Sequence, residues 1–232
     1  MQSPSFGGVG EEKPKKMIIT FATQKGGAGK TTLAIAFANY VSGISERKIK
    51  VYDFDFQKSF YNKWQEDEES ENPKIYNVES IGDDDQSPFK DLEEIINLKE
   101  SEDVYLFDLA GTLDEKYSDI LIYSDFIIIH FEYSDISVKS TLVFKNLLGL
   151  LESEAERIFI RSKYDKGFRY LNQKEMDEEI SKYGMLVESP VYKRNCLQII
   201  NTRKLSYEQK NAVKKPFNEI IEYINKELKI TL

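Results

Sequence analysis

A glycine-rich stretch between a short apolar run and an alanine-rich segment constrains this chain more than any other feature. The apolar run covers Ile18–Ala22, residues 24–32 read QKGGAGKTT, and the alanine-rich segment covers Thr31–Val41. The short apolar run favours a buried strand, and the next segment, which is apolar on most sides, favours a buried helix. A strand, a glycine loop and a helix in this order form the setting that a phosphate-binding loop requires.

The residue types in this loop suit phosphate binding. Glycines let the backbone turn so that successive N–H groups point toward phosphate oxygens, and the positive end of the helix adds to the attraction. Lys30 is placed to reach the β- and γ-phosphates of a nucleotide, and the Thr31 hydroxyl is placed to ligate Mg²⁺. The loop departs from the G-x-x-x-x-G-K-[ST] pattern at Gln24, which replaces glycine, and it carries a second lysine, Lys25. The predicted nucleotide-binding residues are Gly26, Gly27, Ala28, Gly29, Lys30, Thr31 and Thr32.

The rest of the chain alternates apolar runs with segments of helical periodicity. The expected strands are Ile18–Ala22, Ile49–Phe54, Val104–Leu109, Phe126–Phe131, Arg157–Arg161 and Met185–Val187. The expected helices are Thr31–Val41, Asp91–Leu98, Ile136–Leu151, Asn172–Tyr183 and Tyr207–Leu228, the last interrupted or begun afresh at Pro216. Such alternation is typical of a mostly parallel sheet covered on both faces. We therefore expect a doubly wound α/β fold with its ligand at the carboxyl ends of the strands. Residues 17–232 would form one domain after a flexible tail at residues 1–16.

Composition excludes several other classes of protein. The 232 residues are 41% apolar, which is enough for a sizeable core and too much for a wholly disordered chain. A single cysteine, Cys196, and a single histidine, His130, exclude a disulfide framework and a cysteine-rich or multi-histidine metal site within one chain. No apolar run approaches the roughly 20 residues of a membrane-spanning helix, and the first residues lack the apolar segment of a signal peptide. We expect a cytoplasmic protein.

Several segments resemble the ParA/MinD family of ATPases. Residues 25–32 are similar to the deviant Walker A motif of that family, and Asp53–Gln57, which reads DFDFQ, is similar to its D-x-D-P-Q segment. Val104–Gly111 resembles the Walker B strand, and residues 124–129, which read SDFIII, are similar to the next strand of the family. The resemblance covers most of residues 17–160 in motif order and is weaker after that.

This resemblance implies an ATPase that works as a homodimer around two Mg²⁺-ATP. Lys25 matches the signature lysine that reaches the partner's ATP, where it would stabilise charge on the phosphoryl group as an arginine finger does. Asp55 matches the acid that positions the attacking water, and Asp53 matches a neighbour of the Mg²⁺ shell. Asp108 matches the Walker B aspartate, which holds Mg²⁺ through a water. The predicted catalytic residues are Lys25, Lys30 and Asp55, and the predicted metal-site residues are Thr31, Asp53 and Asp108.

Some positions depart from the family pattern. Phe56 stands where proline is usual, and Arg161 stands where an asparagine often helps to recognise adenine, so the base preference stays open. His130 and Tyr133 stand where the family often has prolines. Because His130 ends an apolar strand, we expect a structural histidine. Because Cys196 is the single cysteine of the chain, a reductase like the nitrogenase iron protein is disfavoured, since its cluster needs two cysteines from each chain.

Charge is distributed unevenly along the chain. Residues 66–103 carry 15 acidic residues and three lysines, whereas residues 193–215 carry seven basic residues and one acidic residue. The net charge of −8 disfavours coating of nucleic acid by bulk charge but leaves room for a local patch. In ParA-like proteins, late Lys and Arg residues of the dimer bind DNA without sequence preference. Ordinary solubilising charge is the alternative. The candidate DNA-binding residues are Arg203, Lys204, Lys210, Lys214 and Lys215.

The resemblance implies a slow switch in the partitioning or transfer of a plasmid or conjugative element. Its partners would be non-specific DNA and a ParB-like or other protein. One alternative is a MinD-like ATPase that binds a membrane through the apolar stripe Phe217, Ile220, Ile221, Ile224 and Leu228. Acidic residues beside that stripe favour a core-packing final helix instead, because anionic membranes favour Lys/Arg-rich faces. The other alternative is a nucleotide-binding assembly protein with negligible turnover.

Overall fold

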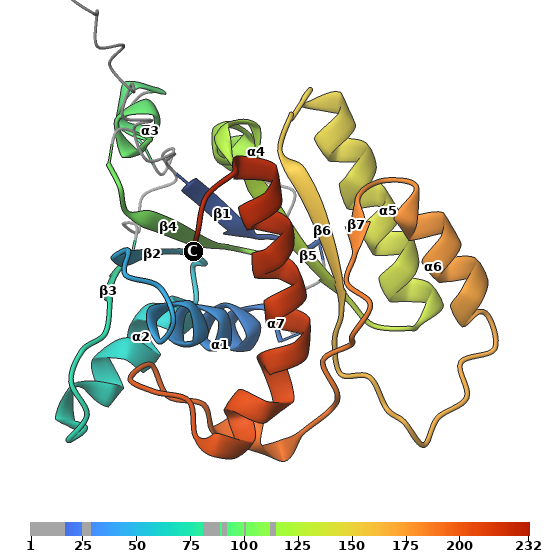
Figure 1. Cartoon of the computed structure of the whole chain (residues 1–232). Coiled ribbons are helices and arrows are strands. Elements are labelled where there is room, and N and C mark those ends of the chain that lie inside the picture. Colours follow the sequence, from blue (N-terminus) through green and yellow to red (C-terminus); the bar gives the residue numbers. More distant parts are fainter. Residues whose placement is uncertain (1–16, 25–28, 81–88, 90–91, 100, 112–114) are drawn as a thin grey trace, which may run out of the picture.

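A seven-stranded sheet organises the computed structural model, which describes residues 17–24, 29–80, 89, 92–99, 101–111 and 115–232 (Figure 1). The strand order is β3-β2-β4-β1-β5-β6-β7. All the pairings between these strands are parallel, which confirms the predicted doubly wound α/β fold. The tail predicted at residues 1–16 lies outside the described residues.

The strands agree closely with the apolar runs of the sequence. They are β1 (Met17–Phe21), β2 (Ile49–Phe54), β3 (Asn77–Ser80), β4 (Val104–Leu109), β5 (Phe126–Phe131), β6 (Glu156–Arg161) and β7 (Met185–Leu186). Only β3 was not predicted. It lies at the edge of the sheet, and only Val78 among its residues is buried, so its sequence lacks an apolar run.

The helices and short turns complete the alternation. The helices are α1 (Lys30–Ser42), α2 (Ser59–Glu66), α3 (Leu92–Leu98), α4 (Ser118–Tyr123), α5 (Asp135–Leu150), α6 (Gln173–Ser181) and α7 (Tyr207–Leu228). The 3-10 turns are η1 (Asp67–Glu69), η2 (Glu115–Tyr117) and η3 (Asn195–Ile199). The sequence pattern did not predict the short helices α2 and α4.

The last helix corrects one expectation. α7 runs without interruption through Pro216, although a proline removes one backbone hydrogen bond and usually costs about 3 kcal/mol inside a helix. Burial of Phe217, Ile220 and Ile221 in the following turn offsets that cost. The apolar stripe of α7 therefore packs into the core, as predicted. None of the described helices is long and apolar enough to cross a membrane.

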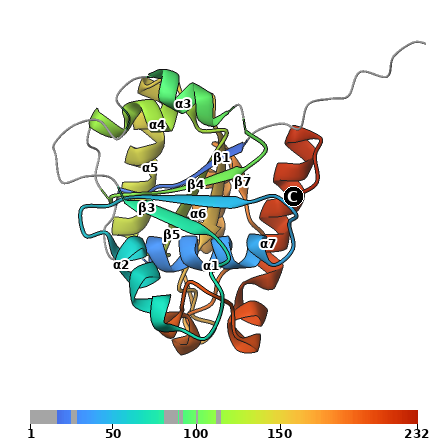
Figure 2. The same cartoon turned by 90° about the vertical axis from the view of Figure 1, so that its left-hand side faces the viewer.

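Helices cover both faces of the sheet. Figure 2 shows α3, α4 and α5 on one side of the strands and α1 and α2 on the other. Two clusters of buried residues match these layers, since the side chains of α1 and α7 join one cluster and those of α4, α5 and α6 join the other. The central strands β1, β4 and β5 are accordingly buried on both faces, which explains their nearly continuous apolar sequences.

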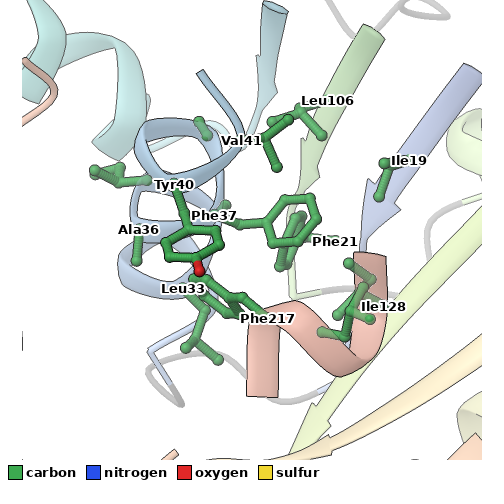
Figure 3. Close-up of a cluster of buried hydrophobic side chains, with 14 of the residues drawn as sticks. Ile19, Phe21, Leu33, Ala36, Phe37, Tyr40, Val41, Leu106, Ile128 and Phe217 are labelled. Carbon is green, nitrogen blue, oxygen red and sulfur yellow. The ribbon is translucent and has the colours of Figure 1, made fainter. Parts of the chain in front are cut away.

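Aromatic packing fixes α1, the helix that opens at the glycine loop. Phe37 is fully buried, and its ring lies 5.6 Å from that of Phe21 and 5.2 Å from that of Phe217, measured between centroids (Figure 3). Edge-on pairs of this kind contribute about 0.5–1.5 kcal/mol each beyond burial. These contacts hold the middle of α1 against β1 and α7.

The register of three neighbouring strands brings the sequence motifs to one edge. Asp108 of β4 lies opposite Phe21, four residues into β1, and opposite Asp53 of β2. The glycine loop follows β1, and Asp55 follows β2. Parallel strands end at the same side of a sheet, so residues far apart in the sequence meet at the site that a doubly wound fold uses for its ligand.

Candidate functional site

The start of α1 supplies the described part of the phosphate loop. Gly29 has φ 87° and precedes the helix in the left-handed region, where a side chain would be strained. Thr31 and Thr32 follow in the first turn and line a cavity of about 1010 Å³. Lys25 and residues 26–28, which were predicted to contact phosphate, lie outside the described residues.

Lys30, which lines this cavity, forms a buried ion pair with Asp108. Their residues are 7% and 1% exposed, and Lys30 Nζ donates a hydrogen bond to Asp108 Oδ1. The other oxygen, Asp108 Oδ2, is buried and has no hydrogen-bond partner. A buried carboxylate oxygen in this state is costly unless a further group satisfies it. The structure thus brings together two of the predicted site residues and leaves one acceptor for a ligand or water.

Asp53, a predicted neighbour of the Mg²⁺ shell, accepts backbone hydrogen bonds through both carboxylate oxygens. Its Oδ2 accepts the backbone N–H groups of Phe60 at 2.9 Å and Tyr61 at 3.0 Å, and its Oδ1 accepts that of Asp55 at 3.0 Å. Burial, and then the nearby Asp108 carboxylate, raise the pKa of Asp53 to about 6. The carboxylate therefore supports the first turn of α2 and the backbone of Asp55, and both of its oxygens are occupied.

Asp55 lies at the rim of the same cavity. Its side chain is half-buried, and Oδ1 accepts the backbone N–H of Gln57 at 2.9 Å. The turn is closed by a second bond, from the N–H of Lys58 to the carbonyl of Asp55 at 2.8 Å. Because Lys58 adopts a left-handed conformation with φ 47°, the chain reverses here and enters α2. The predicted water-positioning acid is thus carried on a short, hydrogen-bonded turn.

The walls of the cavity include residues that the sequence motifs did not indicate. Beyond the motif residues, the lining consists of Ile35, Phe56, Gln57, Ser59, Lys63, Ala110, Gly111, Gln198, Ile199 and Ile200. The last three come from η3 and the residue after it, more than 160 positions after the glycine loop. No local pattern in the sequence signals this contribution, since it depends on how α7 packs.

A second cavity, of about 300 Å³, also borders the first turn of α1. It is lined by Gly29, Thr32, Leu33, Ser162, Lys163, Val191, Tyr192, Lys193, Arg194, Leu197 and Gln198. Gly29 and Thr32 border both cavities, so the two are adjacent. Val191, Tyr192 and Lys193 come from the segment that follows β7.

Arg161 takes no part in either cavity. Its Nη2 donates to the carbonyls of Val187 at 2.6 Å and Glu188 at 2.5 Å, and its Nη1 donates to Asp177 Oδ2 at 3.1 Å. The residue is 8% exposed. Arg161 therefore joins β6, α6 and the chain after β7. The next two residues, Ser162 and Lys163, line the second cavity.

His130 is a buried residue at the end of β5. It is 1% exposed, and neither ring nitrogen has a hydrogen-bond partner. Burial, followed by the charges of Lys30 and Lys163, lowers the pKa of His130 to about 3, so the ring is neutral at physiological pH. This agrees with the structural histidine expected from the sequence.

The candidate DNA-binding residues separate into two groups. Lys204, Lys210, Lys214 and Lys215 are exposed at and before the first half of α7. Arg203, in contrast, is 2% exposed and donates from Nε to the carbonyl of Asp67 at 3.0 Å and from Nη2 to that of Trp64 at 2.9 Å. Its guanidinium group is committed to the interior, so the prediction of a surface cation at Arg203 was wrong.

The residues at the cavity fit a magnesium ion bound together with a nucleotide. Within the described ranges, no cluster of three His, Cys, Asp or Glu side chains is placed to hold a metal alone. Mg²⁺ is commonly held by one or two protein oxygens together with waters and substrate phosphates. The orphaned Oδ2 of Asp108 and the hydroxyl of Thr31 provide oxygens of this kind.

Fold and site together define a phosphate-loop nucleotide-binding protein: a parallel sheet, a glycine loop opening a buried helix, and a Lys–Asp pair at the carboxyl edge. The chain belongs to the family described as CobQ/CobB/MinD/ParA nucleotide binding domain, which matches residues 19–217. No curated protein sequence matches the chain.

Solved structures share this fold at low sequence identity. A candidate plasmid partition protein of Borrelia burgdorferi B31 bound to AMPPNP is 22% identical, with a TM-score of 0.71 over 92% of this chain and 100% of that one. MinD of Aquifex aeolicus, in complex with MinC, is 12% identical, with a TM-score of 0.67 over 90% and 96%. The pNOB8 ParA bound to nonspecific DNA is 14% identical, with a TM-score of 0.59 over 91% and 99%. The fold is thus that of ParA/MinD-type proteins.

Proposed function

We propose that this protein is a Mg²⁺-dependent ATPase that acts as a nucleotide-controlled switch in a homodimer. The observation that carries the proposal is the cavity of about 1010 Å³ at the carboxyl edge of the sheet, where Lys30, Thr31 and Asp55 meet. Lys30, which lines this cavity, is paired with the buried Asp108. Family membership supports nucleotide binding, and the fold shared with an AMPPNP-bound protein supports ATP as the ligand.

Each residue at the cavity has a defined task in this proposal. Lys30 would leave Asp108 and bind the β- and γ-phosphates, while the backbone amides of the first turn of α1 hold phosphate oxygens. Thr31 would ligate Mg²⁺ and Asp108 would contact it through a water, and the ion would neutralise phosphate charge. Asp55 would orient the water that attacks the γ-phosphate, since its carboxylate faces the cavity from a hydrogen-bonded turn.

The base of the nucleotide would occupy the smaller cavity. That cavity of about 300 Å³ is adjacent to the phosphate site, because Gly29, Thr32 and Gln198 line both cavities. Tyr192 and Leu197 provide apolar surface for a planar base, and Ser162 provides a hydroxyl for a hydrogen bond. Lys30 lines only the larger cavity, so it would lie beside the phosphates of the bound nucleotide.

Dimerisation would complete the site. By resemblance, Lys25 of one chain reaches the ATP bound to the second copy, which makes hydrolysis depend on protein concentration. A cation that arrives only in the dimer can accelerate phosphoryl transfer about 10³-fold or more, as arginine fingers do. Hydrolysis would release the dimer, and the cycle would be slow because it serves as a switch.

Steady-state phosphate release tests this proposal. We expect turnover per chain to rise with protein concentration, to require Mg²⁺ and to fall by about 10³-fold in Lys25→Ala. Lys174→Ala is the matched control, because the side chain of Lys174 is 89% exposed on α6, away from the cavity. Absence of any turnover, with nucleotide binding intact, would instead indicate an assembly protein in which binding alone matters.

For the partner, we propose duplex DNA bound without sequence preference. Lys210 and Lys214 lie one turn apart on α7, and Tyr207, 82% exposed, lies one turn before Lys210. Lys204 and Lys215 extend the same exposed basic region, and a dimer would present two copies of it. Clustered cations suffice for phosphate contacts. The switch would act in the partitioning or transfer of a plasmid or conjugative element, and a ParB-like or other protein would regulate it.

DNA binding is measured in Mg²⁺-ATP and Mg²⁺-ADP at two salt concentrations. We expect binding only with ATP, a steep loss of affinity with salt, and a shallower salt slope in the double variant Lys210→Ala, Lys214→Ala. Lys226→Ala, at the other end of α7, should behave like the wild type. If neither nucleotide supports DNA binding, the DNA proposal fails. Flotation with anionic liposomes then tests the MinD-like alternative.

A further inference from the structure

An ammonium group lies over an exposed aromatic ring at the mouth of the main cavity. Lys116 Nζ is 3.8 Å from the centroid of the Phe56 ring, and Phe56 is 52% exposed. Phe56 follows Asp55 directly and lines the cavity. Lys116 belongs to η2, more than 50 residues later in the chain. The contact therefore joins two different loops beside the acid assigned to the attacking water.

The neighbouring residue of η2 holds the other side of Asp55. Tyr117 is 3% exposed and donates from its hydroxyl to the carbonyl of Phe54 at 2.7 Å. Consecutive residues of one turn, Lys116 and Tyr117, thus contact the residues immediately after and before Asp55. This arrangement restrains the Asp55 backbone from both sides, through one buried contact and one exposed contact.

The turn that makes these contacts follows the strand that carries Asp108. β4 ends at Leu109, and the next residues, Ala110 and Gly111, line the cavity before the chain reaches η2. Asp53 and Asp108 are paired in register, so the loops after β2 and β4 leave the sheet side by side. A change in the loop after Asp108 would consequently reach Phe56 through Lys116.

The two contacts differ in how easily they can be released. Tyr117 is part of the core, and its hydroxyl is buried, so its contact belongs to the fold. The contact between Lys116 and Phe56 is partly exposed, since Phe56 is 52% exposed and Lys116 is half-buried, with its Nζ also 5.3 Å from the Tyr117 ring centroid. A cation–π contact that is open to solvent is weak enough to break and re-form readily. The family usually has proline at the position of Phe56, and the proline ring would fix the backbone angle φ covalently. In this protein, the contact with Lys116 restrains the same position without a covalent constraint.

We infer that Lys116 and Phe56 are positioning residues for Asp55, which they hold at the cavity through a releasable cation–π contact between the loops after β4 and β2. The inference rests on the proposed role of Asp55 in ATP hydrolysis. Loss of the contact should leave nucleotide binding intact, since neither side chain belongs to the phosphate loop. It should lower the rate of hydrolysis by about two- to fivefold, the factor that corresponds to an exposed cation–π contact.

The test combines kinetics with a direct probe of the contact. Phe56→Leu removes the ring, Lys116→Met removes the charge, and Phe56→Tyr keeps the ring. We expect kcat for ATP to fall about two- to fivefold in the first two variants, with KM unchanged, and the double variant to be no slower than either one. Phe56→Tyr should retain the wild-type kcat. Phe168→Leu, at another exposed phenylalanine, is the control.

Proton NMR of the lysine side chains reports the contact without any turnover. The ε-methylene protons of Lys116 should be shifted upfield by the Phe56 ring, with the shift lost in Phe56→Leu and kept in Phe56→Tyr. An unshifted Lys116 in the wild type would overturn the inference whatever the ATPase result. If the wild type hydrolyses ATP and both single variants match it, the positioning role is refuted while the proposed function stands. If the wild type hydrolyses no ATP, the proposed function fails and the positioning role fails with it.

Discussion

Replacing Arg203 with alanine removes a buried cation that joins α2 to the chain segment before α7. The guanidinium group donates to the carbonyls of Trp64 and Asp67, and it lies 5.4 Å from the Trp64 ring centroid. Asp67 adds a second link, because its Oδ2 accepts the backbone N–H of Thr202 at 2.7 Å. Arg203 is thus one part of a connection between the Asp55 side of the cavity and the basic region of α7.

The expected loss of stability follows from these contacts. Each of the two hydrogen bonds has a charged donor and contributes at least about 1.5 kcal/mol to stability. We use this lower value because Nη1 of the same guanidinium group is buried without a partner, which offsets part of the gain. Arg203→Ala should therefore lower the free energy of unfolding by about 3 kcal/mol. At about 2–4 °C per kcal/mol for a chain of this size, the melting temperature should fall by about 6–12 °C.

Urea denaturation followed by circular dichroism measures this change, with Lys204→Ala as the matched control. Lys204 is the exposed neighbour of Arg203, and its replacement should change the free energy of unfolding by no more than about 0.5 kcal/mol. A loss below about 1 kcal/mol in Arg203→Ala, or equal losses in the two variants, would refute the interior role. Unchanged stability with weakened DNA binding would make Arg203 a surface phosphate contact after all.

Three further predictions address the site and the packing around it. Asp55→Asn should lower kcat about 100-fold or more while AMPPNP affinity in calorimetry stays unchanged, since a carboxylate that handles the attacking water acts on the rate. Wild-type stability should lose about 2 kcal/mol between pH 7 and pH 5 relative to His130→Leu. In the unfolded chain, His130 binds a proton when the pH falls below its usual pKa of 6.5, whereas burial lowers its pKa in the folded protein to about 3. Acid therefore favours the unfolded state in this pH range. Equal pH dependence of the two unfolding curves would refute this. Gly184→Ala should destabilise by about 1–3 kcal/mol, because its Cβ would lie 2.3 Å from the carbonyl oxygen of Arg157. Gly149→Ala, which meets nothing within 4 Å inside α5, should stabilise by about 0.5–1 kcal/mol, and the reverse order of thermal midpoints would contradict both.

Local patterns predicted the sheet and the first turn of α1 well. The apolar runs that became β2, β4 and β5 matched their observed bounds because most residues of these strands are buried and therefore apolar. The helix after the glycine loop was predicted from Thr31 and begins one residue earlier, at Lys30, since a glycine loop between strand and helix constrains its own geometry. These signals lie within a few residues of the structure that they predict.

The burial of two arginines depends on partners that are distant in the sequence. Arg203 donates to the carbonyls of Trp64 in α2 and Asp67 in η1, 139 and 136 residues earlier in the chain, and Arg161 donates to carbonyls 26 and 27 residues later. A run of basic residues predicts that its cations are exposed, and only knowledge of such distant partners would change that prediction. The continuity of α7 through Pro216 has the same cause, because burial of the following turn against the core outweighs the local cost.

The central claim is that the cavity beside Lys30 and Asp108 binds a nucleoside triphosphate. Calorimetric titration of Mg²⁺-AMPPNP into the wild type and into Lys30→Ala tests it most directly. Binding of one nucleotide per chain by the wild type, with affinity reduced about tenfold or more in the variant, is the predicted result, since a charge-assisted contact to phosphate is lost. No binding by the wild type, or equal affinity in both proteins, would contradict the assignment of this cavity as the nucleotide site.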